Sequence, residues 1–323
     1  MDISIVVPLY NEVESLGELV EKIADVADAH GYSYEVIMVD DGSKDGSWQK
    51  IKELSESYPQ VRGIKFGRNY GKSPALHMGF QAAQGDVVIT MDADLQDNPE
   101  EIPGLYRMIQ EEGYDLVSGW KKKRYDPPSK TIPTKLFNAV TRKVTGIHLH
   151  DFNCGLKAYR LDVVKSIEVY GEMHRYIPVL AKYAGYGHIG EKEVVHQARP
   201  YGVSKFGGLN RFVNGFLDLI TLVFTRKYVK RPMHFFGTWG VIFALIGGIN
   251  LFYLAFIRLV QNIWISDRLP ALIFGAVAFL SGILLFTVGL LGELIVRNSS
   301  GRNNYHVSQR LGFDHQEQMH RSS

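Results

Sequence analysis

Two long uncharged stretches near the C-terminus constrain the fold of this chain more than any other feature. They run from Phe235 to Ile257 and from Pro270 to Gly292, and each contains 23 residues without a charged side chain. At about 1.5 Å per residue, a helix of that length crosses the roughly 30 Å of hydrocarbon in a bilayer. Helices of a soluble core usually keep a polar stripe, whereas only residues such as Asn250 and Ser281 interrupt these stretches. The sequence therefore predicts two transmembrane helices.

Basic residues flank the two stretches unequally. Those before the first stretch and after the second are Arg226, Lys227, Lys230, Arg231, Arg297, Arg302 and Arg310. Only Arg258 and Arg268 lie between the stretches. Because basic flanks favour the cytoplasmic side, we expect a multi-pass protein of the inner (plasma) membrane with both termini cytoplasmic.

The segment before the first stretch has an amphipathic pattern. Phe212, Phe216, Ile220 and Val223 fall near one helical face. Such a helix next to a membrane span lies in the lipid interface, and the alternative is a helix packed on the preceding domain. The predicted organisation is a cytosolic domain over residues 1–205, a juxtamembrane segment over 206–231, a two-helix hairpin over 232–297 and a cytoplasmic tail over 298–323.

Composition excludes several classes of protein. The 36 basic and 34 acidic residues leave a formal net charge of +2, which gives no global field for binding nucleic acid. The only cysteine, Cys154, excludes an intramolecular disulfide and a Cys-rich zinc site. Met1-Asp2 leads directly into the short apolar run of the first expected strand. The basic region and the long apolar region of a secretory signal are not found there.

The first two hundred residues alternate short apolar runs with helical patterns. The expected strands are Ile3 to Val7, Glu35 to Val39, Val61 to Phe66, Val87 to Met91 and Asp115 to Val117. The expected helices begin near Val13 and Ser47, and run from Ser73 to Ala83 and from Pro99 to Glu111. This order predicts an α/β domain with a mostly parallel sheet covered on both faces. Ligands of such sheets bind beyond the carboxyl ends of the strands.

Polar residues follow three of the expected strands. The segments are Pro8 to Glu12, Asp40 to Ser43, and Asp92 to Asp97. Asp92 and Asp94 end an apolar strand, where two carboxylates repel unless a cation neutralises them. Mg²⁺ and Mn²⁺ prefer oxygen ligands and bind one or two carboxylates together with diphosphate oxygens. We therefore expect a metal at Asp92, Asp94 and Gln96, with a solvated acidic helix cap as the alternative.

Two other motif matches fail on structural context. The run from Gly185 to Gly190 spells a dinucleotide-binding motif, but it follows a helical stretch and leads into an expected strand. Gly71-Lys72-Ser73 resembles the end of a P-loop, but the position five before Gly71 is Phe66, so the glycine spacing fails by one residue. Lys72 still stands at the start of a helix, where phosphate binds. The histidines lack the spacing of a metal site and receive no role.

Together, these segments resemble glycosyltransferase family 2. The resemblance is closest to its polyprenyl-phosphate branch, which includes undecaprenyl-phosphate glucosyltransferases and dolichol-phosphate mannose synthase. The segments from Asp151 to Lys157 and from Arg199 to Lys205 support the resemblance, which covers nearly the whole chain. It implies a GT-A (Rossmann-like) fold, a metal-dependent enzyme and a homo-oligomer, with a tetramer expected.

The resemblance also implies roles for individual residues. The implied nucleotide-binding residues, with Lys72 added from the pattern above, are Pro8, Tyr10, Glu12, Asp40, Asp41, Lys72, Asp92 and Ala93. The metal, Mg²⁺ or Mn²⁺, is expected at Asp92, Asp94 and Gln96, and the expected catalytic residues are Asp94, Asp151 and Arg199. The acceptor phosphate is expected at Lys121, Arg199, Ser204 and Lys205. Lys121 stands where relatives often carry arginine, and lysine cannot bind phosphate bidentately.

The implied reaction transfers a sugar from a nucleotide sugar to a polyprenyl phosphate, expected to be undecaprenyl phosphate, with inversion at the anomeric carbon. Asp151 orients the acceptor or acts as a base. UDP-glucose is the first expectation for the donor, ahead of UDP-N-acetylglucosamine, an aminoarabinose donor and GDP-mannose. Two alternatives are a processive polysaccharide synthase, whose Gln-x-x-Arg-Trp motif the sequence lacks, and a non-catalytic membrane scaffold.

Overall fold

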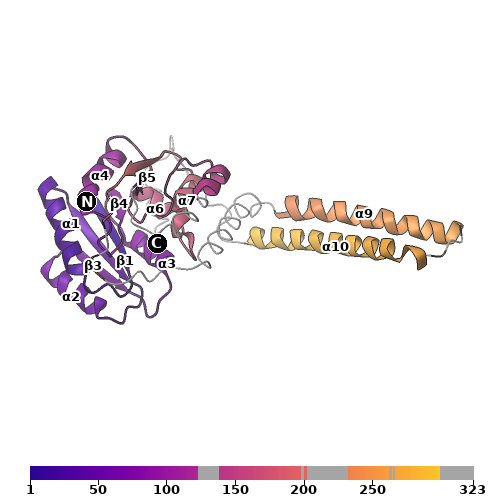
Figure 1. Cartoon of the computed structure of the whole chain (residues 1–323), viewed down its shortest axis with the longest axis horizontal. Helices are drawn as coiled ribbons and strands as arrows, with labels where there is room; N and C mark the ends of the chain where they lie inside the picture. The colour runs from indigo at the N-terminus through magenta and orange to yellow at the C-terminus, as the bar shows by residue number, and fades with distance from the viewer. Residues whose placement is uncertain (123–137, 198–199, 202–231, 262–263, 265, 299–323) are drawn as a thin grey trace, which may run out of the picture. The chain divides into compact units, whose positions relative to one another are not determined.

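The chain divides into two compact units in a computed structural model, Met1–Leu219 and Ile220–Ser323 (Figure 1). The structure describes residues 1–122, 138–197, 200–201, 232–261, 264 and 266–298. The first unit contains an α/β domain and the second a helical hairpin. The predicted amphipathic segment lies outside the described residues, as does the predicted tail beyond residue 298, so the four predicted domain boundaries stay predictions.

The first unit is built on a seven-stranded sheet in the order β3-β2-β1-β4-β6-β5-β7. The strands are β1 (Ile3–Leu9), β2 (Tyr34–Asp40), β3 (Val61–Lys65), β4 (Val87–Thr90), β5 (Leu116–Trp120), β6 (Lys157–Arg160) and β7 (Ile189–Glu193). Only β6 runs antiparallel to its neighbours in this sheet. The predicted α/β class with a mostly parallel sheet is confirmed.

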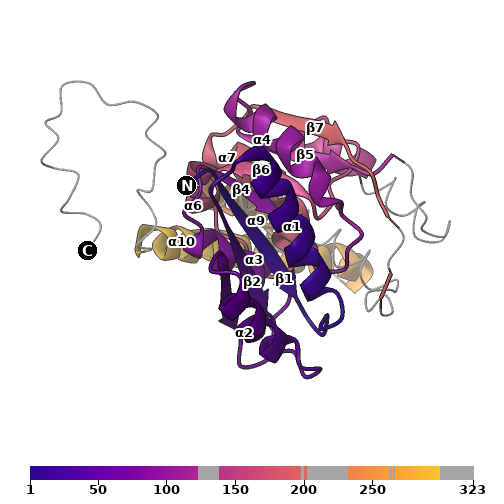
Figure 2. The same cartoon turned by 90° about the vertical axis from the view of Figure 1, so that its left-hand side faces the viewer.

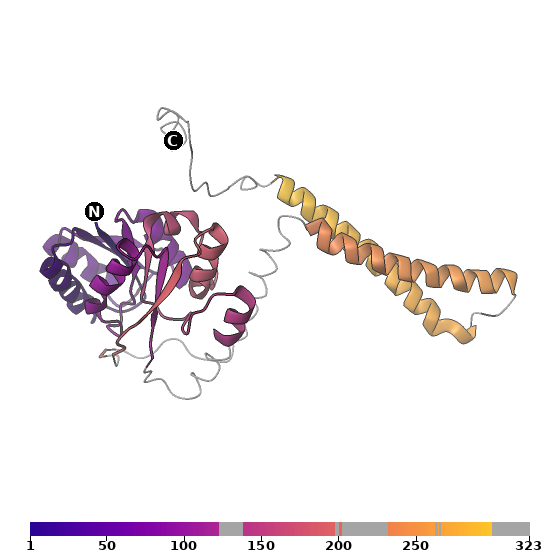
Figure 3. The ribbon, with the colours of Figure 1, turned by 90° about the horizontal axis from the view of Figure 1, so that it is seen from above.

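Helices cover both faces of the sheet (Figures 2 and 3). They are α1 (Leu16–His30), α2 (Ser47–Ser57), α3 (Lys72–Ala82), η1 (Pro99–Glu101), α4 (Ile102–Gln110), α6 (Leu161–Ser166), η2 (Met173–Tyr176) and α7 (Ile177–Ala184). Ile5 and Val7 of β1 share a buried cluster with Leu19 of α1 and Leu105 of α4. Helix α3 packs on β1 and β2 beside α6. Because β1 and β2 are covered on both faces, all their side chains are buried, which explains their largely apolar sequences. The buried polar residues Ser4 and Glu35 are hydrogen-bonded to each other (2.6 Å).

Two sequence expectations differ from the structure. Strand β6 was not predicted, because Lys157–Arg160 is a short run with a charged residue at each end, and it is a strand only through its pairing with β4 and β5. Helix α1 begins at Leu16 and not near Val13. The residues before Leu16 are bound to the segment at the start of α2 and do not join the helix. The Glu12 amide donates to Ser47 Oγ (3.0 Å) and the Val13 amide to Asp45 Oδ2 (3.2 Å).

Strands β1 and β4 mark the point at which the chain reverses its direction across the sheet. From β1 the chain proceeds to β2 and β3 on one side, and it returns to β4 on the other side of β1. The carboxyl ends of these parallel strands lie at one edge of the sheet. Ligands of open α/β sheets bind in the crevice at such a switch point. The segments after β1, β2 and β4 therefore form the candidate site.

The second unit consists of α9 (Pro232–Val260), η3 (Ser266–Arg268) and α10 (Leu269–Asn298). Both long helices have the length and hydropathy needed to cross a membrane, as predicted. They pack closely through glycine: a Cβ added at Gly240 would lie 2.8 Å from the Gly282 carbonyl oxygen. Most of their large apolar side chains are exposed, unlike those of a soluble core helix. A lipid environment satisfies such a surface.

Candidate active site

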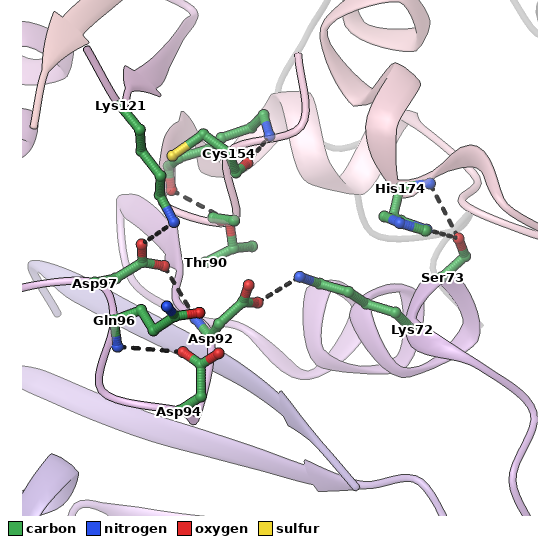
Figure 4. Close-up of polar contacts among 12 residues, drawn as sticks. Lys72, Ser73, Thr90, Asp92, Asp94, Gln96, Asp97, Lys121, Cys154 and His174 are labelled. Carbon is green, nitrogen blue, oxygen red and sulfur yellow. Dashed lines mark hydrogen bonds and ion pairs between the residues drawn. The ribbon is translucent and has the colours of Figure 1, made fainter. Parts of the chain in front are cut away.

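The acidic turn after β4 is the centre of the site (Figure 4). Asp94 and Gln96 are half-buried, and the Gln96 amide donates to Asp94 Oδ1 (3.2 Å). Leu95 between them has a φ of 60°, a left-handed conformation that is uncommon outside glycine. This sharp turn directs the polar side chains on either side of Leu95 to one region.

An ammonium group pairs with the first carboxylate of the turn. Lys72, the first residue of α3, forms an ion pair with Asp92 Oδ1. Both side chains are about one-third exposed, 29% for Lys72 and 33% for Asp92. Burial alone would raise the pKa of Asp92, but Lys72 and Lys121 outweigh it and lower this pKa to about 2. The sequence argument required a cation beside Asp92, and in this structure Lys72 supplies it.

A second ion pair joins the turn to β5. Lys121, directly after β5, lies 2.8 Å from Asp97 Oδ1, and the two side chains are only 13% and 1% exposed. Burial would lower the pKa of Lys121, but Asp97 and Asp92 outweigh it and raise this pKa. The buried pair shows that Lys121 holds the turn in place. Its predicted contact with the acceptor phosphate stays a prediction.

The segment before Arg199 runs beside the same turn. Asp97 and His196 form an isolated antiparallel β-bridge, and the Gln197 amide donates to the Gln96 carbonyl (3.0 Å). Arg199 itself and the predicted acceptor residues Ser204 and Lys205 lie outside the described residues. The described chain nevertheless leads into that segment from a position next to the acidic turn.

The segments after β1 and β2 are joined to each other. The Asn11 amide donates to Ser43 Oγ and the Lys44 amide to Asn11 Oδ1, both over 2.8 Å. Asp40, the last residue of β2, accepts a hydrogen bond from the Ser43 amide at Oδ1 (2.8 Å). Its other oxygen, Oδ2, is buried and accepts no hydrogen bond from the described residues. A buried carboxylate oxygen of this kind can accept an N–H from a bound base.

Asp41 connects β2 to the start of α3. Its two carboxylate oxygens accept the amides of Tyr70 (2.6 Å) and Gly71 (2.8 Å), directly before Lys72. Burial raises the pKa of Asp41, and these two hydrogen bonds oppose the rise. Asp41 was predicted to bind the nucleotide, and the structure shows that it orders the backbone that presents Lys72 to Asp92.

The loop before β6 packs over Asp92. Thr90 Oγ1 donates to the Gly155 carbonyl (2.7 Å), and a Cβ added at Gly155 would lie 2.5 Å from Asp92 Oδ2. Only glycine permits this approach. Asp151, in the same loop, is 1% exposed and accepts the Asn153 amide at Oδ1 (3.0 Å). The role of Asp151 as a base or as an orienting group for the acceptor stays a prediction.

Lys157, the first residue of β6, was missed as a site residue. Its side chain is buried, and Nζ donates to the carbonyls of Phe152 (3.3 Å) and Cys154. Burial lowers the pKa of this amine. Through its hydrogen bonds to the two carbonyls, the Lys157 side chain holds the loop that packs over Asp92. Lysine is rarely buried unless it has polar partners, so a lysine at the start of a buried run is the sequence signal that could have identified Lys157 as a site residue.

The predicted nucleotide and metal residues gather at one edge of the sheet. Hydrogen bonds and ion pairs connect the segments after β1, β2, β4 and β5 and the start of α3. Pro8 and Ala93 are buried, whereas Tyr10 and Glu12 are half-buried at the end of β1. The structure thus brings together the described residues of the predicted nucleotide and metal sites.

The oxygen donors of the turn fit a divalent ion. Asp92, Asp94 and Gln96 offer carboxylate and amide oxygens, which Mg²⁺ and Mn²⁺ prefer. Across the described ranges, no group of three or more His, Cys, Asp or Glu residues could hold a metal. The protein therefore offers about two carboxylates, and phosphate and water oxygens complete the shell of an ion bound in this way.

If a metal ion binds at Asp92 as predicted, Lys72 would compete with it, because the ammonium pairs with a carboxylate oxygen that the ion would use. We expect Lys72→Met to tighten Mn²⁺ binding about three- to tenfold when no nucleotide is present, the effect of a partly exposed ion pair. Electron paramagnetic resonance of the full chain in detergent measures free Mn²⁺. Lys44→Met removes an exposed charge at the same edge and serves as control. Unchanged or weaker binding in the Lys72 variant would refute the competition.

Cys154 is expected to be unreactive in the folded protein. Burial raises the pKa of its thiol to about 12, so the reactive thiolate is scarce at pH 8. Iodoacetamide at pH 8 should therefore leave Cys154 unmodified in the native chain and alkylate it in urea, as measured by intact mass. Rapid alkylation of the native chain would show that the loop over Asp92 opens readily.

Comparison with known proteins identifies the family. The profile of "Glycosyl transferase family 2" matches residues 4–168, about half of the chain. Within the matched range lie the acidic turn and the segments after β1 and β2. The sequence resemblance to this family is therefore confirmed.

Two relatives align over almost their full length. The dodecaprenyl-phosphate galacturonate synthase of Rhizobium johnstonii is 36% identical, over 98% of this chain and 95% of the relative. The undecaprenyl-phosphate 4-deoxy-4-formamido-L-arabinose transferase of Shewanella sediminis is 37% identical, over 96% of this chain and 92% of the relative. Both are named for a polyprenyl phosphate.

A solved structure confirms the fold of the first unit. Glucosyl-3-phosphoglycerate synthase from Mycobacterium tuberculosis, crystallised with Mn²⁺ and UDP-glucose, superposes with a TM-score of 0.53. The superposition covers 70% of this chain and 78% of that protein, with 20% sequence identity. On the family match and the two relatives, the chain belongs to glycosyl transferase family 2 and is a glycosyltransferase.

Proposed function

We propose that this protein transfers a sugar from a nucleoside diphosphate sugar to a polyprenyl phosphate at a membrane surface. The observation that carries the proposal is the acidic turn Asp92 to Asp97 at the switch point of the sheet, in a chain with two apolar helices. The relatives named for dodecaprenyl and undecaprenyl phosphate support a polyprenyl acceptor, because they align over nearly the whole chain, including these helices.

The nucleoside would bind between the ends of β1 and β2. The buried Oδ2 of Asp40 has acceptor capacity for an N–H of the base. Tyr10 and Glu12 follow β1 and lie half-buried beside it. The joined loops of Asn11 and Ser43 give this region a fixed shape before the ligand arrives.

The diphosphate would lie between the acidic turn and α3. Asp92, Asp94 and Gln96 would hold the divalent ion, Mg²⁺ or Mn²⁺, which stabilises negative charge on the leaving diphosphate. Lys72 would leave Asp92 and donate to a phosphate oxygen, because the helix start and the ammonium both favour anions. The glucosyl-3-phosphoglycerate synthase crystallised with Mn²⁺ and UDP-glucose supports this arrangement.

The proposed reaction is an in-line displacement. An oxygen of the lipid phosphate forms a bond to the anomeric carbon, while the bond from that carbon to the diphosphate oxygen breaks and the electron pair leaves with the nucleoside diphosphate. The configuration at the anomeric carbon inverts. Since a phosphate monoester is ionised at neutral pH, the step needs no general base, and Asp151 would then orient the acceptor.

The acceptor phosphate would approach from the side of Arg199, Ser204 and Lys205. Gln197 lies hydrogen-bonded to the acidic turn, so these residues follow it within a short length of chain. An anionic lipid headgroup needs cationic partners at the membrane surface. With both termini cytoplasmic, as the basic flanks favour, the reaction would occur on the cytoplasmic face of the inner membrane. A homo-oligomer, expected as a tetramer, is part of the proposal.

The test uses the purified full chain in detergent with undecaprenyl phosphate, Mg²⁺ or Mn²⁺, and a panel of labelled nucleotide sugars. The panel contains UDP-glucose, UDP-N-acetylglucosamine, an aminoarabinose donor, GDP-mannose and UDP-uronic acids. We expect an organic-soluble labelled product that requires the metal and the lipid. A product formed equally without the lipid, or none with any donor, would contradict the proposal.

A further inference from the structure

Strand β7 carries two glutamates on one face, and they differ in exposure. Glu191 and Glu193 are two residues apart, so their side chains point to the same face of the sheet. The Glu193 side chain is 55% exposed and pairs with the exposed side chain of Lys122. The Glu191 side chain is only 12% exposed, although β7 lies at the edge of the sheet. A carboxylate held at such low exposure is costly unless polar groups bind it.

The groups that bind Glu191 come from two consecutive residues of the loop before β6. Oε1 accepts the backbone amides of His150 (2.8 Å) and Asp151 (3.1 Å), and Oε2 lies 2.7 Å from His150 Nδ1. Hydrogen bonds to an ionised group are about twice as strong as those between neutral groups. Glu191 therefore fixes the main chain at this pair of residues as well as the His150 ring.

The carbonyls of the same two residues are held from other elements. Asn138 Nδ2 donates to the His150 carbonyl (2.7 Å), and Ser118 Oγ of β5 donates to the Asp151 carbonyl (3.3 Å). Both of these side chains are buried. All four main-chain groups of the pair are thus hydrogen-bonded, and one carboxylate, that of Glu191, accepts both amides.

The other end of this loop is held by contacts that do not involve Glu191. Thr90 Oγ1 donates to the Gly155 carbonyl (2.7 Å), and Lys157 Nζ donates to two further carbonyls of the loop. This end packs against Asp92, at the position proposed for the metal and the diphosphate. Loss of the Glu191 carboxylate should therefore displace the first end of the loop and leave the second end against Asp92.

We propose that Glu191 is a positioning residue for the acceptor step: through the amides of His150 and Asp151 it fixes Asp151, the residue proposed to orient the lipid phosphate. Nucleotide binding at the other end of the loop does not depend on it. The inference rests on the proposed function, because it assigns a further residue to that reaction. A group that orients a substrate must be held in place by its neighbours, and a misplacement of about 1 Å can cost about 10²-fold in rate.

The test measures nucleotide binding and lipid transfer separately in Glu191→Ala. The full chain in detergent is titrated with UDP and with GDP in the presence of Mn²⁺, and transfer to undecaprenyl phosphate is measured with the donor panel given above. We expect kcat/KM for the lipid to fall about ten- to hundredfold. The Kd of the nucleotide that binds should change less than about twofold.

Two further variants identify the group responsible. Glu191→Gln keeps a side-chain oxygen for the two amides and should retain lipid transfer within about threefold of the wild type. Glu193→Ala is the matched control, because it removes a carboxylate from the same face of β7 whose pair with Lys122 is exposed. It should keep wild-type kcat/KM. Thermal unfolding of each variant sets an assay temperature at which all of them are folded.

Hydrogen exchange of the protein without ligands measures the loop directly. In Glu191→Ala, peptides that contain the amides of His150 and Asp151 should exchange about tenfold faster, the effect of losing one hydrogen bond to a charged group. Peptides from α3 and β4 should exchange as in the wild type. Faster exchange throughout the first unit would instead show a general loss of stability and would contradict a positioning role.

The outcomes separate the inference from the function on which it rests. Wild-type kcat and lipid KM in Glu191→Ala would overturn the inference while the proposed transfer stands. Equal losses of nucleotide affinity and of transfer would overturn it too, as would a Glu191→Gln variant as slow as Glu191→Ala. A wild-type protein that transfers no sugar to the lipid from any donor would refute the proposed function, and the inference would fall with it.

Discussion

Asp94→Asn is expected to lower the rate of sugar transfer by about two to three orders of magnitude, with little change in stability. Asp94 is half-buried and its Oδ1 accepts a hydrogen bond from the Gln96 amide (3.2 Å), which the side-chain oxygen of asparagine can also accept. The substitution removes the charge proposed to hold the divalent ion, whose stabilisation of the leaving group is worth several kcal/mol. Initial rates with saturating donor, and Mn²⁺ affinity in the same samples, measure the effect.

Two controls make this result specific. Asp25→Asn on the exposed face of α1 makes the same chemical change far from the turn in sequence and should keep full activity. Raising the Mn²⁺ concentration should recover part of the rate of Asp94→Asn if weakened metal binding is the cause. Wild-type activity of Asp94→Asn at low metal concentration would remove this residue from the site.

Asp97→Ala is expected to destabilise the first unit by about 3–5 kcal/mol, the usual cost of removing one partner from a buried ion pair. The variant leaves Lys121 buried beside the turn, where its side chain is 13% exposed. Because the folded pKa of Lys121 is raised, the pair stabilises the fold at neutral pH, and this contribution is lost only as pH rises above the unfolded pKa. Thermal unfolding at pH 7 should shift down by about 10 °C.

A double variant tests whether the stranded charge causes this loss. Asp97→Ala combined with Lys121→Met should be clearly more stable than Asp97→Ala alone, because no buried charge remains unpaired. Glu193→Ala removes a partner from the exposed pair with Lys122 and should cost less than about 1 kcal/mol. If Asp97→Ala is as stable as the wild type, the pair does not hold the turn. The same follows if the double variant is no more stable than Asp97→Ala alone.

The sequence was most informative where local pattern and position along the chain coincide. The apolar runs after Ile3 and Tyr34 are strands because their side chains are buried on both faces, and their polar successors must then lie at one edge. The same logic placed Asp40 and Asp92 in one site. The two uncharged stretches likewise became long helices whose ends fall near the expected residues.

The features that the sequence could not predict depend on contacts between distant segments. Strand β6 forms only against β4 and β5, and four residues carry too little pattern to show it. Two ion pairs join distant positions: Lys121 lies 24 residues after Asp97, and Asp92 lies 20 residues after Lys72. No periodicity in the sequence encodes such a pair. Gly155 is required by a carboxylate packed against its Cα, which is visible only in three dimensions.

Lys72 is the residue that the proposed function would use twice. In this structure its ammonium forms an ion pair with Asp92. Binding of the metal and diphosphate would transfer Lys72 to the phosphates, so the same charge serves the ion pair first and substrate binding afterwards. The order of α3 behind it, fixed by the hydrogen bonds of Asp41 to Tyr70 and Gly71, limits how far Lys72 must move.

The most direct test of the central claim is the mass of the lipid product, measured together with the released nucleotide. The account predicts a polyprenyl phosphate carrying one glycosyl residue through a phosphodiester, with one nucleoside diphosphate released for each product. A polyprenyl diphosphate sugar with release of a nucleoside monophosphate would contradict the proposed displacement at the anomeric carbon. A polymer of many sugar residues would instead indicate a processive synthase.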